Sequence, residues 1–186
     1  MPIIRDEHLG VQSKGRLVNL ISLCVVEIGR GAPALVVLQF AYFGLPQGGL
    51  TLSSFASAVF ALAWNTGAYT SEIIRAGLES VPFGEIEASS AMGMMRADTL
   101  RFVIIPQGLR VAAPALLGFA AAMLQATSLC FTIALPELTS NAYVIGTNTF
   151  RYIEILSLAG ILYAVICAPA TIAVEVLERR LGKHTR

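Results

Sequence analysis

The sequence predicts an all-α protein, a polytopic bundle of membrane-spanning helices. Composition is the first reason, because the 186 residues are 55% hydrophobic and only 13% charged, with a mean hydropathy of +0.70. Soluble domains are typically less apolar and about twice as charged. The second reason is that the charged residues leave long runs free of Asp, Glu, Lys and Arg. The net charge of +1 indicates no basic surface for nucleic acid.

Three charge-free runs place the predicted helices. They cover residues 31–71, 111–136 and 155–174. Because a helix needs roughly 20 apolar residues to cross the hydrocarbon core, the first run has room for two crossings. The turn residues of GLPQGGLTLS, at 44–53, divide that run. The sequence therefore predicts about four membrane helices, near residues 31–46, 51–76, 107–135 and 152–178.

The basic residues predict the orientation. Four crossings place both chain ends and a loop at 77–106 on one side of the membrane. Every Lys and Arg except Arg151 then lies on that side, which is a strong positive-inside pattern. The predicted organisation is a cytoplasmic N-terminal segment (1–30), a transmembrane domain (31–178) that includes the cytoplasmic loop 77–106, and a cytoplasmic tail (179–186).

The cytoplasmic loop has a helical pattern of its own. Residues 82–84 (PFG) end the incoming helix, and 85–92 form a helical run with acids in its first turn, where they favour the helix dipole. Gly93 breaks or bends this run. A second helical stretch follows at 98–105, and Pro106 sets the start of the next membrane helix. The pattern predicts two short helices joined at a glycine, although a surface hairpin that caps two membrane helices explains it equally well.

The loop resembles the EAA loop of permease subunits of ABC importers. The family pattern is Glu-Ala-Ala, three residues, Gly, nine residues, then Ile-x-Leu-Pro. Here Glu87-Ala88-Ser89 is followed by Gly93, and VIIP at 103–106 closes the motif at the same spacing. The resemblance implies that the loop docks in a groove of an ATP-binding subunit. The residues expected to couple the chain to that subunit are Glu87, Ala88, Ser89, Gly93, Ile105 and Pro106.

Other segments resemble the permeases for polar amino acids. They are RGAP at 30–33, YFGLP at 42–46, NTGAY at 65–69, TSL at 127–129 and PELT at 136–139. The resemblance implies a permease subunit that moves a polar amino acid across the bacterial inner membrane. Members usually have five membrane helices, and the chain has no counterpart of the first.

The resemblance also implies partners. The chain has no GxxxxGK[ST] phosphate loop and no evident nucleophile–base pair, so neither a catalytic residue nor an enzyme is predicted. No cofactor is expected on this chain, and ATP with Mg²⁺ would be bound by a partner subunit. The other implied partners are a second permease subunit, in a homo- or heterodimer, an extracytoplasmic amino-acid-binding protein and the lipid bilayer. The sequence predicts no metal site or disulfide framework from Cys24, Cys130, Cys167, His8 and His184.

Polar side chains within the predicted helices are candidates for the cargo path. Polar groups inside a membrane bundle are energetically expensive and usually have partners or a function. The candidates are Gln39, Asn65, Thr66, Gln125, Thr127 and Ser128. The alternative for each is interhelical hydrogen bonding, which Asn, Gln, Ser and Thr commonly provide. Glu72 lies three residues before Arg75, which predicts a local ion pair.

Two other functions stay open at this point. A stand-alone secondary transporter would usually show an internal repeat, and none is convincing in this chain. A truncated permease that inserts without transporting is the second, because a counterpart of the family's first helix is missing.

Overall fold

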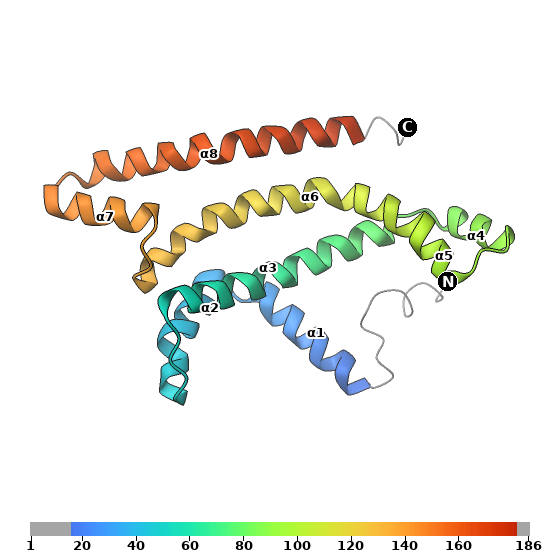
Figure 1. The fold of residues 1–186 in the computed structure, drawn as a ribbon, viewed down its shortest axis with the longest axis horizontal. Coiled ribbons are helices and arrows are strands. Elements are labelled where there is room, and N and C mark those ends of the chain that lie inside the picture. Colours follow the sequence, from blue (N-terminus) through green and yellow to red (C-terminus); the bar gives the residue numbers. More distant parts are fainter. Residues whose placement is uncertain (1–15, 182–186) are drawn as a thin grey trace.

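A computed structural model describes residues 16–181. Residues 1–15 of the expected N-terminal segment and 182–186 of the expected tail, with His8 and His184, lie outside the described residues. Within 16–181 every regular element is a helix, which confirms the predicted fold class (Figure 1).

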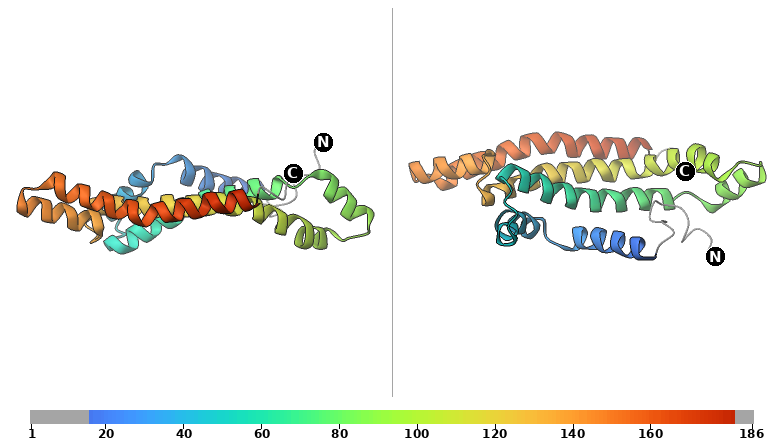
Figure 2. Two further views of the ribbon diagram at one scale, coloured as in Figure 1. Left: turned by 90° about the horizontal axis from the view of Figure 1, so that it is seen from above. Right: turned by 60° about the horizontal axis from the view of Figure 1, so that its bottom comes forward.

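Three long helices form the body of the molecule. They are α3 (Ser54–Glu79), α6 (Ile105–Ala126) and α8 (Tyr152–Leu181). They lie side by side, and α6 packs against both of the others (Figures 1 and 2). A 3₁₀ segment, η4 (Thr127–Ile133), extends α6. These elements agree with the helices expected at 51–76, 107–135 and 152–178.

The helix expected at 31–46 is instead one arm of a bent pair. The first arm is α1 (Arg16–Gly31), which lies within the segment expected to precede the membrane domain. The second arm contains α2 (Ala34–Gln39) and continues to Gly48, and the chain bends by 107° between the two arms. The bend falls at Pro33, whose ring fixes φ and which has no backbone N–H to continue the helix. We call this bend the elbow.

A short helix that the sequence analysis missed, α7 (Leu138–Thr149), forms a hairpin with α8. It occupies part of the connection expected at 136–151. Glu137 caps it, because its carboxylate accepts hydrogen bonds from the backbone N–H groups of Thr139 (2.7 Å) and Ser140 (2.6 Å). The Ser140 hydroxyl accepts in return from Glu137 N (2.8 Å), which completes a capping box. Figure 1 shows this hairpin at the end of the bundle opposite α4 and α5.

Two stretches of the described chain are long and apolar enough to cross a membrane. They are the helical stretch 96–133 and the segment Tyr152–Val174 of α8. The bent pair passes the same test if its arms are counted as one span. The test does not include α3, whose 26 residues suffice in length but include Asn65, Thr66 and Thr70. Length and apolarity thus support two or three of the four expected crossings.

A π-helical turn precedes two of the prolines. In η1 (Phe40–Gly44) the N–H of Leu45 bonds to the carbonyl of Phe40, and Pro46 follows. In η3 (Thr99–Ile104) the N–H of Ile105 bonds to the carbonyl of Leu100, and Pro106 follows. A proline cannot donate to the carbonyl four residues back, and its ring crowds that carbonyl. The wider π turn removes this conflict and lets the helix continue through each proline.

Glycine sets the closest contact between α3 and α6. A Cβ on Gly77 would lie 2.5 Å from the carbonyl oxygen of Gly108 and 2.8 Å from the Cβ of Ala112. A Cβ on Gly108 would lie 2.7 Å from the Cα of Leu78. The two helices therefore touch through their backbones at the point where both enter the loop 77–106.

Candidate functional site

The EAA loop (residues 77–106) forms two short helices joined by a tight turn. The first is α4 (Phe83–Ala91), and the second, α5 (Arg96–Asp98), runs on through η3 into α6. Gly93 lies in the turn with φ +79°, a conformation that favours glycine. The Gly93 N–H donates to Ser90 O (3.0 Å), and the Met94 N–H donates to Ser89 O (3.1 Å). The glycine joint expected from the sequence is therefore present.

A buried hydrogen bond holds the two short helices together. Ser89 and Thr99 are 1% and 5% exposed, and their hydroxyl oxygens lie 3.0 Å apart. The Ser89 hydroxyl donates to Ile86 O (2.7 Å), so Thr99 is the donor between the two. Gln107 also donates from its side-chain amide to the carboxylate of Glu85, which links α4 to the first turn of α6. The loop is thus a folded unit joined to a membrane helix.

The outer surface of this unit carries both polar and apolar side chains. Glu87 and Ala88 are exposed on α4, and Met92 and Met95 beside the turn are each 75% exposed. Ile105 and Pro106 are exposed at the start of α6. Of the six predicted coupling residues, Ser89 alone is buried. A partner would therefore meet a rigid surface with two exposed methionines that the sequence analysis did not single out.

Side chains of α3 bind the C-terminal end of α1. Three of them donate hydrogen bonds to backbone carbonyls there: Trp64 Nε1 to Val25 O (3.0 Å), Asn65 Nδ2 to Gly29 O (2.9 Å) and Tyr69 Oη to Arg30 O (3.0 Å). The last four carbonyls of a helix have no partner within it, so two of these bonds satisfy groups that would otherwise be unpaired. A Cβ on Gly29 would lie 2.8 Å from the Cβ of Ala68, so the approach is close.

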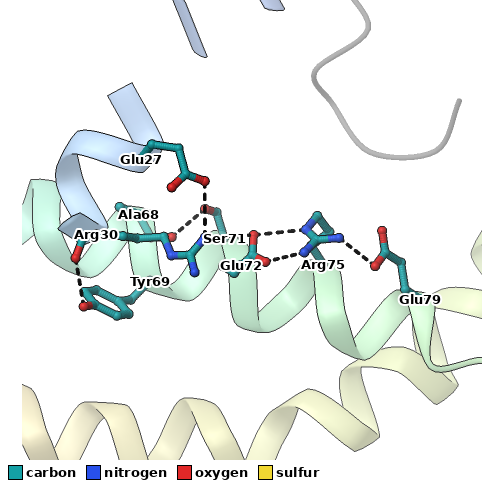
Figure 3. A network of polar contacts seen from close by, with 8 residues as sticks. All are labelled: Glu27, Arg30, Ala68, Tyr69, Ser71, Glu72, Arg75 and Glu79. Carbon is teal, nitrogen blue, oxygen red and sulfur yellow. Dashed lines mark hydrogen bonds and ion pairs between the residues drawn. The ribbon is translucent and has the colours of Figure 1, made fainter. Parts of the chain in front are cut away.

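Beside these hydrogen bonds, a series of ion pairs runs from the end of α1 along α3 (Figure 3). Arg30 of α1 lies 3.5 Å from Glu27 and 3.6 Å from Glu72 of α3. Arg75 Nε lies 3.0 Å from Glu72, which confirms the local pair expected from the sequence, and Arg75 also pairs with Glu79 at 2.6 Å. The five side chains alternate in sign, so no charge in the series faces a like neighbour.

A cavity of about 480 Å³ opens at the elbow, beside this junction. Its lining comes from three parts of the chain: the residues of the elbow, α3 and α6. Tyr69 of α3 and Phe119 of α6 stack within it, with ring centroids 5.2 Å apart and planes at 27°. The lining residues are Arg30, Gly31, Ala32, Pro33, Ala34, Asn65, Tyr69, Phe119 and Met123.

Of the six candidate cargo residues, Asn65 is the one that lines the elbow cavity. Its amide is already bonded to Gly29 O. Thr66 is half-buried on α3, and Gln39 is exposed at the end of α2. The others, Gln125, Thr127 and Ser128, lie at the end of α6 and in η4. Asn65 therefore forms an interhelical hydrogen bond, which is the alternative that the sequence analysis gave for each candidate.

We expect Asn65→Leu to destabilise the junction between α1 and α3. Leucine is of similar size but cannot donate, so the carbonyl of Gly29 loses its side-chain partner in a buried setting. An unsatisfied buried polar group costs about 1–3 kcal/mol. The melting temperature of the purified chain in detergent should fall, whereas Gln39→Leu, at an exposed site, should leave it nearly unchanged. Equal melting temperatures for Asn65→Leu and the parent would show that this bond does not hold the junction.

Comparison with known proteins identifies the family to which the chain belongs. Residues 9–183 match the family model of the binding-protein-dependent transport system inner membrane component. The chain belongs to this family. The probable amino-acid ABC transporter permease protein YckA of Bacillus subtilis is 34% identical over 95% of this chain and 78% of its own length. The L-cystine transport system permease protein TcyB of the same organism is 37% identical over 95% and 76%.

A solved structure has the same fold as this chain. It is described as the crystal structure of an amino acid ABC transporter with histidines, and the match has a TM-score of 0.85 at 35% identity, over 91% of this chain and 79% of that one. The resemblance drawn from the EAA loop is therefore confirmed. This permease is the inner-membrane component of a transport system that also uses a binding protein.

Proposed function

We propose that this permease is a transmembrane subunit of an ATP-driven importer for a polar amino acid. The observation that carries the proposal is the EAA loop, a folded two-helix unit continuous with the membrane helix α6. The permeases for amino acids and for L-cystine to which the chain is similar support the class of cargo. The identity of the second permease subunit, the same chain or a relative, stays open in this proposal.

In this proposal the loop receives the force that an ATP-binding subunit generates. Glu87, Ala88, Ile105 and Pro106 provide its exposed contacts, together with Met92 and Met95. Ser89 acts from inside, because its bond with Thr99 keeps the two helices at a fixed angle. Gly93 permits the turn that sets this angle. When the ATP-binding subunits close, the loop moves as one unit and carries the first turn of α6 with it through Gln107.

The cargo then passes along the face of α6 that contains the elbow cavity. Phe119 joins α6 to Tyr69, and Tyr69 in turn binds the carbonyl of Arg30 at the elbow. A shift of α6 therefore moves Phe119 in the cavity wall directly and reaches the elbow through two contacts. Gln39, Thr66, Gln125, Thr127 and Ser128 are assigned to the same path as polar positions in or beside the helices, with Asn65 in the cavity wall.

The orientation proposed for the chain has the EAA loop and both chain ends in the cytoplasm. The described end of α8 lies toward α4 and α5, and the α7–α8 hairpin lies at the other end (Figure 1). Arg75, Arg96, Arg101 and Arg110 belong to the loop end of the bundle, and Arg151 belongs to the hairpin. This distribution supports a cytoplasmic loop end by the positive-inside rule.

Co-purification in mild detergent tests the coupling role. The chain is expressed with the ATP-binding subunit encoded beside it, as the parent and as the double variant Glu87→Lys plus Gly93→Asp. We expect the ATP-binding subunit to purify with the parent and to be lost from the variant, because the variant reverses one exposed charge and disturbs the turn. Both chains should reach the membrane in similar amounts, since both positions are exposed.

The matched control is Gln47→Lys, which also adds a positive charge at an exposed position, in the connection 44–53 and outside the loop. It should retain the ATP-binding subunit. If that subunit fails to bind the inserted parent chain, or binds the double variant equally well, the loop is not the coupling element. The first of these results would favour the alternative of a permease that inserts without transporting.

A further inference from the structure

Phe150, in the turn between α7 and α8, combines two unfavourable features. Its backbone has φ +56°, a left-handed conformation that costs an L-residue about 1–2 kcal/mol. The residue is 89% exposed, the largest value among the large hydrophobic residues whose exposure the structure describes. Glycine would relieve the backbone and remove the exposed ring. No contact within the described chain accounts for a phenylalanine here, so an external environment is the remaining explanation.

The turn that carries Phe150 is rigid. The N–H groups of Phe150 and Arg151 both bond to Gly146 O, at the end of α7. Tyr152 packs on the same glycine, where a Cβ would lie 3.1 Å from its ring, and its hydroxyl donates to Thr147 Oγ1 (2.9 Å). The Phe150 ring is therefore held outward by the fold around it.

Phe150 and a second exposed apolar residue lie at the start of a membrane span, among polar neighbours. Ile153, in the next turn, is 82% exposed. The charges nearby compensate each other, since Arg151 Nε lies 3.2 Å from Glu154. The apolar segment Tyr152–Val174 has 23 residues and is about 34 Å long at 1.5 Å per residue, close to the roughly 30 Å of the hydrocarbon core. Phe150 thus falls where that core meets the headgroup layer.

We propose that Phe150 and Ile153 insert into the headgroup–acyl boundary of the membrane leaflet remote from the EAA loop. Aromatic rings favour this boundary, and Tyr143 and Tyr152, whose centroids lie 5.7 Å apart, extend the aromatic surface along the hairpin. The insertion fixes the depth of the α7–α8 hairpin, and with it the register of α8 in the bilayer. The occupant of this surface is lipid.

Spin-label accessibility in lipid nanodiscs tests the insertion on the full chain. A nitroxide is placed at Ile153→Cys in a Cys24→Ser background, because Cys24 is exposed whereas Cys130 and Cys167 are buried. Collisions with lipid-soluble oxygen and with a water-soluble nickel chelate report the depth of the label. We expect oxygen to dominate at position 153, and nickel to dominate at Asn148→Cys, an exposed polar position on α7.

The decisive comparison adds Phe150→Gly to the label at position 153. We expect the ratio of oxygen to nickel collisions to fall several-fold, whereas Phe150→Trp should preserve it. Phe150→Gly should also melt in detergent at or above the temperature of the parent, because it relieves the backbone. Ala134→Gly, at the other described non-glycine residue with positive φ, is the matched control and should leave the ratio unchanged.

An unchanged ratio in Phe150→Gly overturns the proposal, as does dominance of nickel at position 153 in the parent. Exclusion of both reagents from that position also overturns it, and would assign the surface to a protein partner.

Discussion

Replacing Gly93 by aspartate should leave the permease in the membrane and abolish ATP-driven uptake. A Cβ at this position would meet nothing within 4 Å, so the substitution creates no clash. The effect comes from the backbone, because φ is +79° and an L-residue there is strained by about 1–2 kcal/mol. The turn can relax only by changing the angle between α4 and the helix that leads into α6. Uptake of labelled amino acid, normalised to the amount of inserted protein, measures the effect.

Two substitutions separate the backbone effect from the added charge. Gly84→Asp adds the same charge to the same exposed loop, but Gly84 lies in the first turn of α4, where an acid is favourable. It should retain most of the uptake. Gly93→Val is uncharged but, as a β-branched residue, tolerates the left-handed region poorly, so it should lose uptake as Gly93→Asp does. Normal uptake in Gly93→Asp would show that the angle of the joint is dispensable.

The second large effect is expected where α3 meets α6. Valine at Gly77 would drive a branched side chain into the carbonyl of Gly108 and the backbone of Ala112. Inserting extra methyl groups into a packed contact typically costs about 1–3 kcal/mol, and backbone atoms cannot move aside as side chains do. We expect Gly77→Val and Gly108→Val to lower the melting temperature strongly and to reduce the yield of folded chain.

The same two helices provide the controls. A Cβ added to Gly67 on α3 or to Gly118 on α6 would meet nothing within 4 Å, so Gly67→Ala and Gly118→Ala should melt at the parent temperature or slightly above it. Gly77→Ala and Gly108→Ala are the matched changes at the contact and should melt lower. Similar melting temperatures for all four alanine variants would mean that the helices can separate at this point without loss.

The long helices could be predicted because charged residues and a proline mark their boundaries in the sequence. Charge-free runs and Pro106 placed α3, α6 and α8 within a few residues. By contrast, α1 was missed because Glu27 and Arg30 interrupt its apolar sequence. The 12-residue helix α7 is too short for a membrane span, and its capping by Glu137 depends on a local geometry that composition does not reveal.

The sequence predicted the loop of the candidate site but not the cavity. The spacing of Glu87, Gly93 and Pro106 is local, so it can be recognised in a linear sequence. The partner of Asn65 is a carbonyl 36 residues away, and only packing brings the two together. Polarity in a helix indicated that Asn65 needs a partner, but it did not distinguish cargo from a neighbouring helix. The exposure of Met92 and Met95 likewise follows from the folded loop.

The π turn before Pro106 also explains why the number of residues between Gly93 and Pro106 matters. A helix turns by about 100° for each residue, and a π turn accommodates one residue more than an α turn. The turn therefore sets the rotational phase of α6 relative to the loop. One residue more or fewer in this interval would rotate Phe119 and Met123 away from the elbow while leaving every helix intact. The spacing of the motif therefore fixes the angle at which α6 presents Phe119 and Met123 to the elbow cavity.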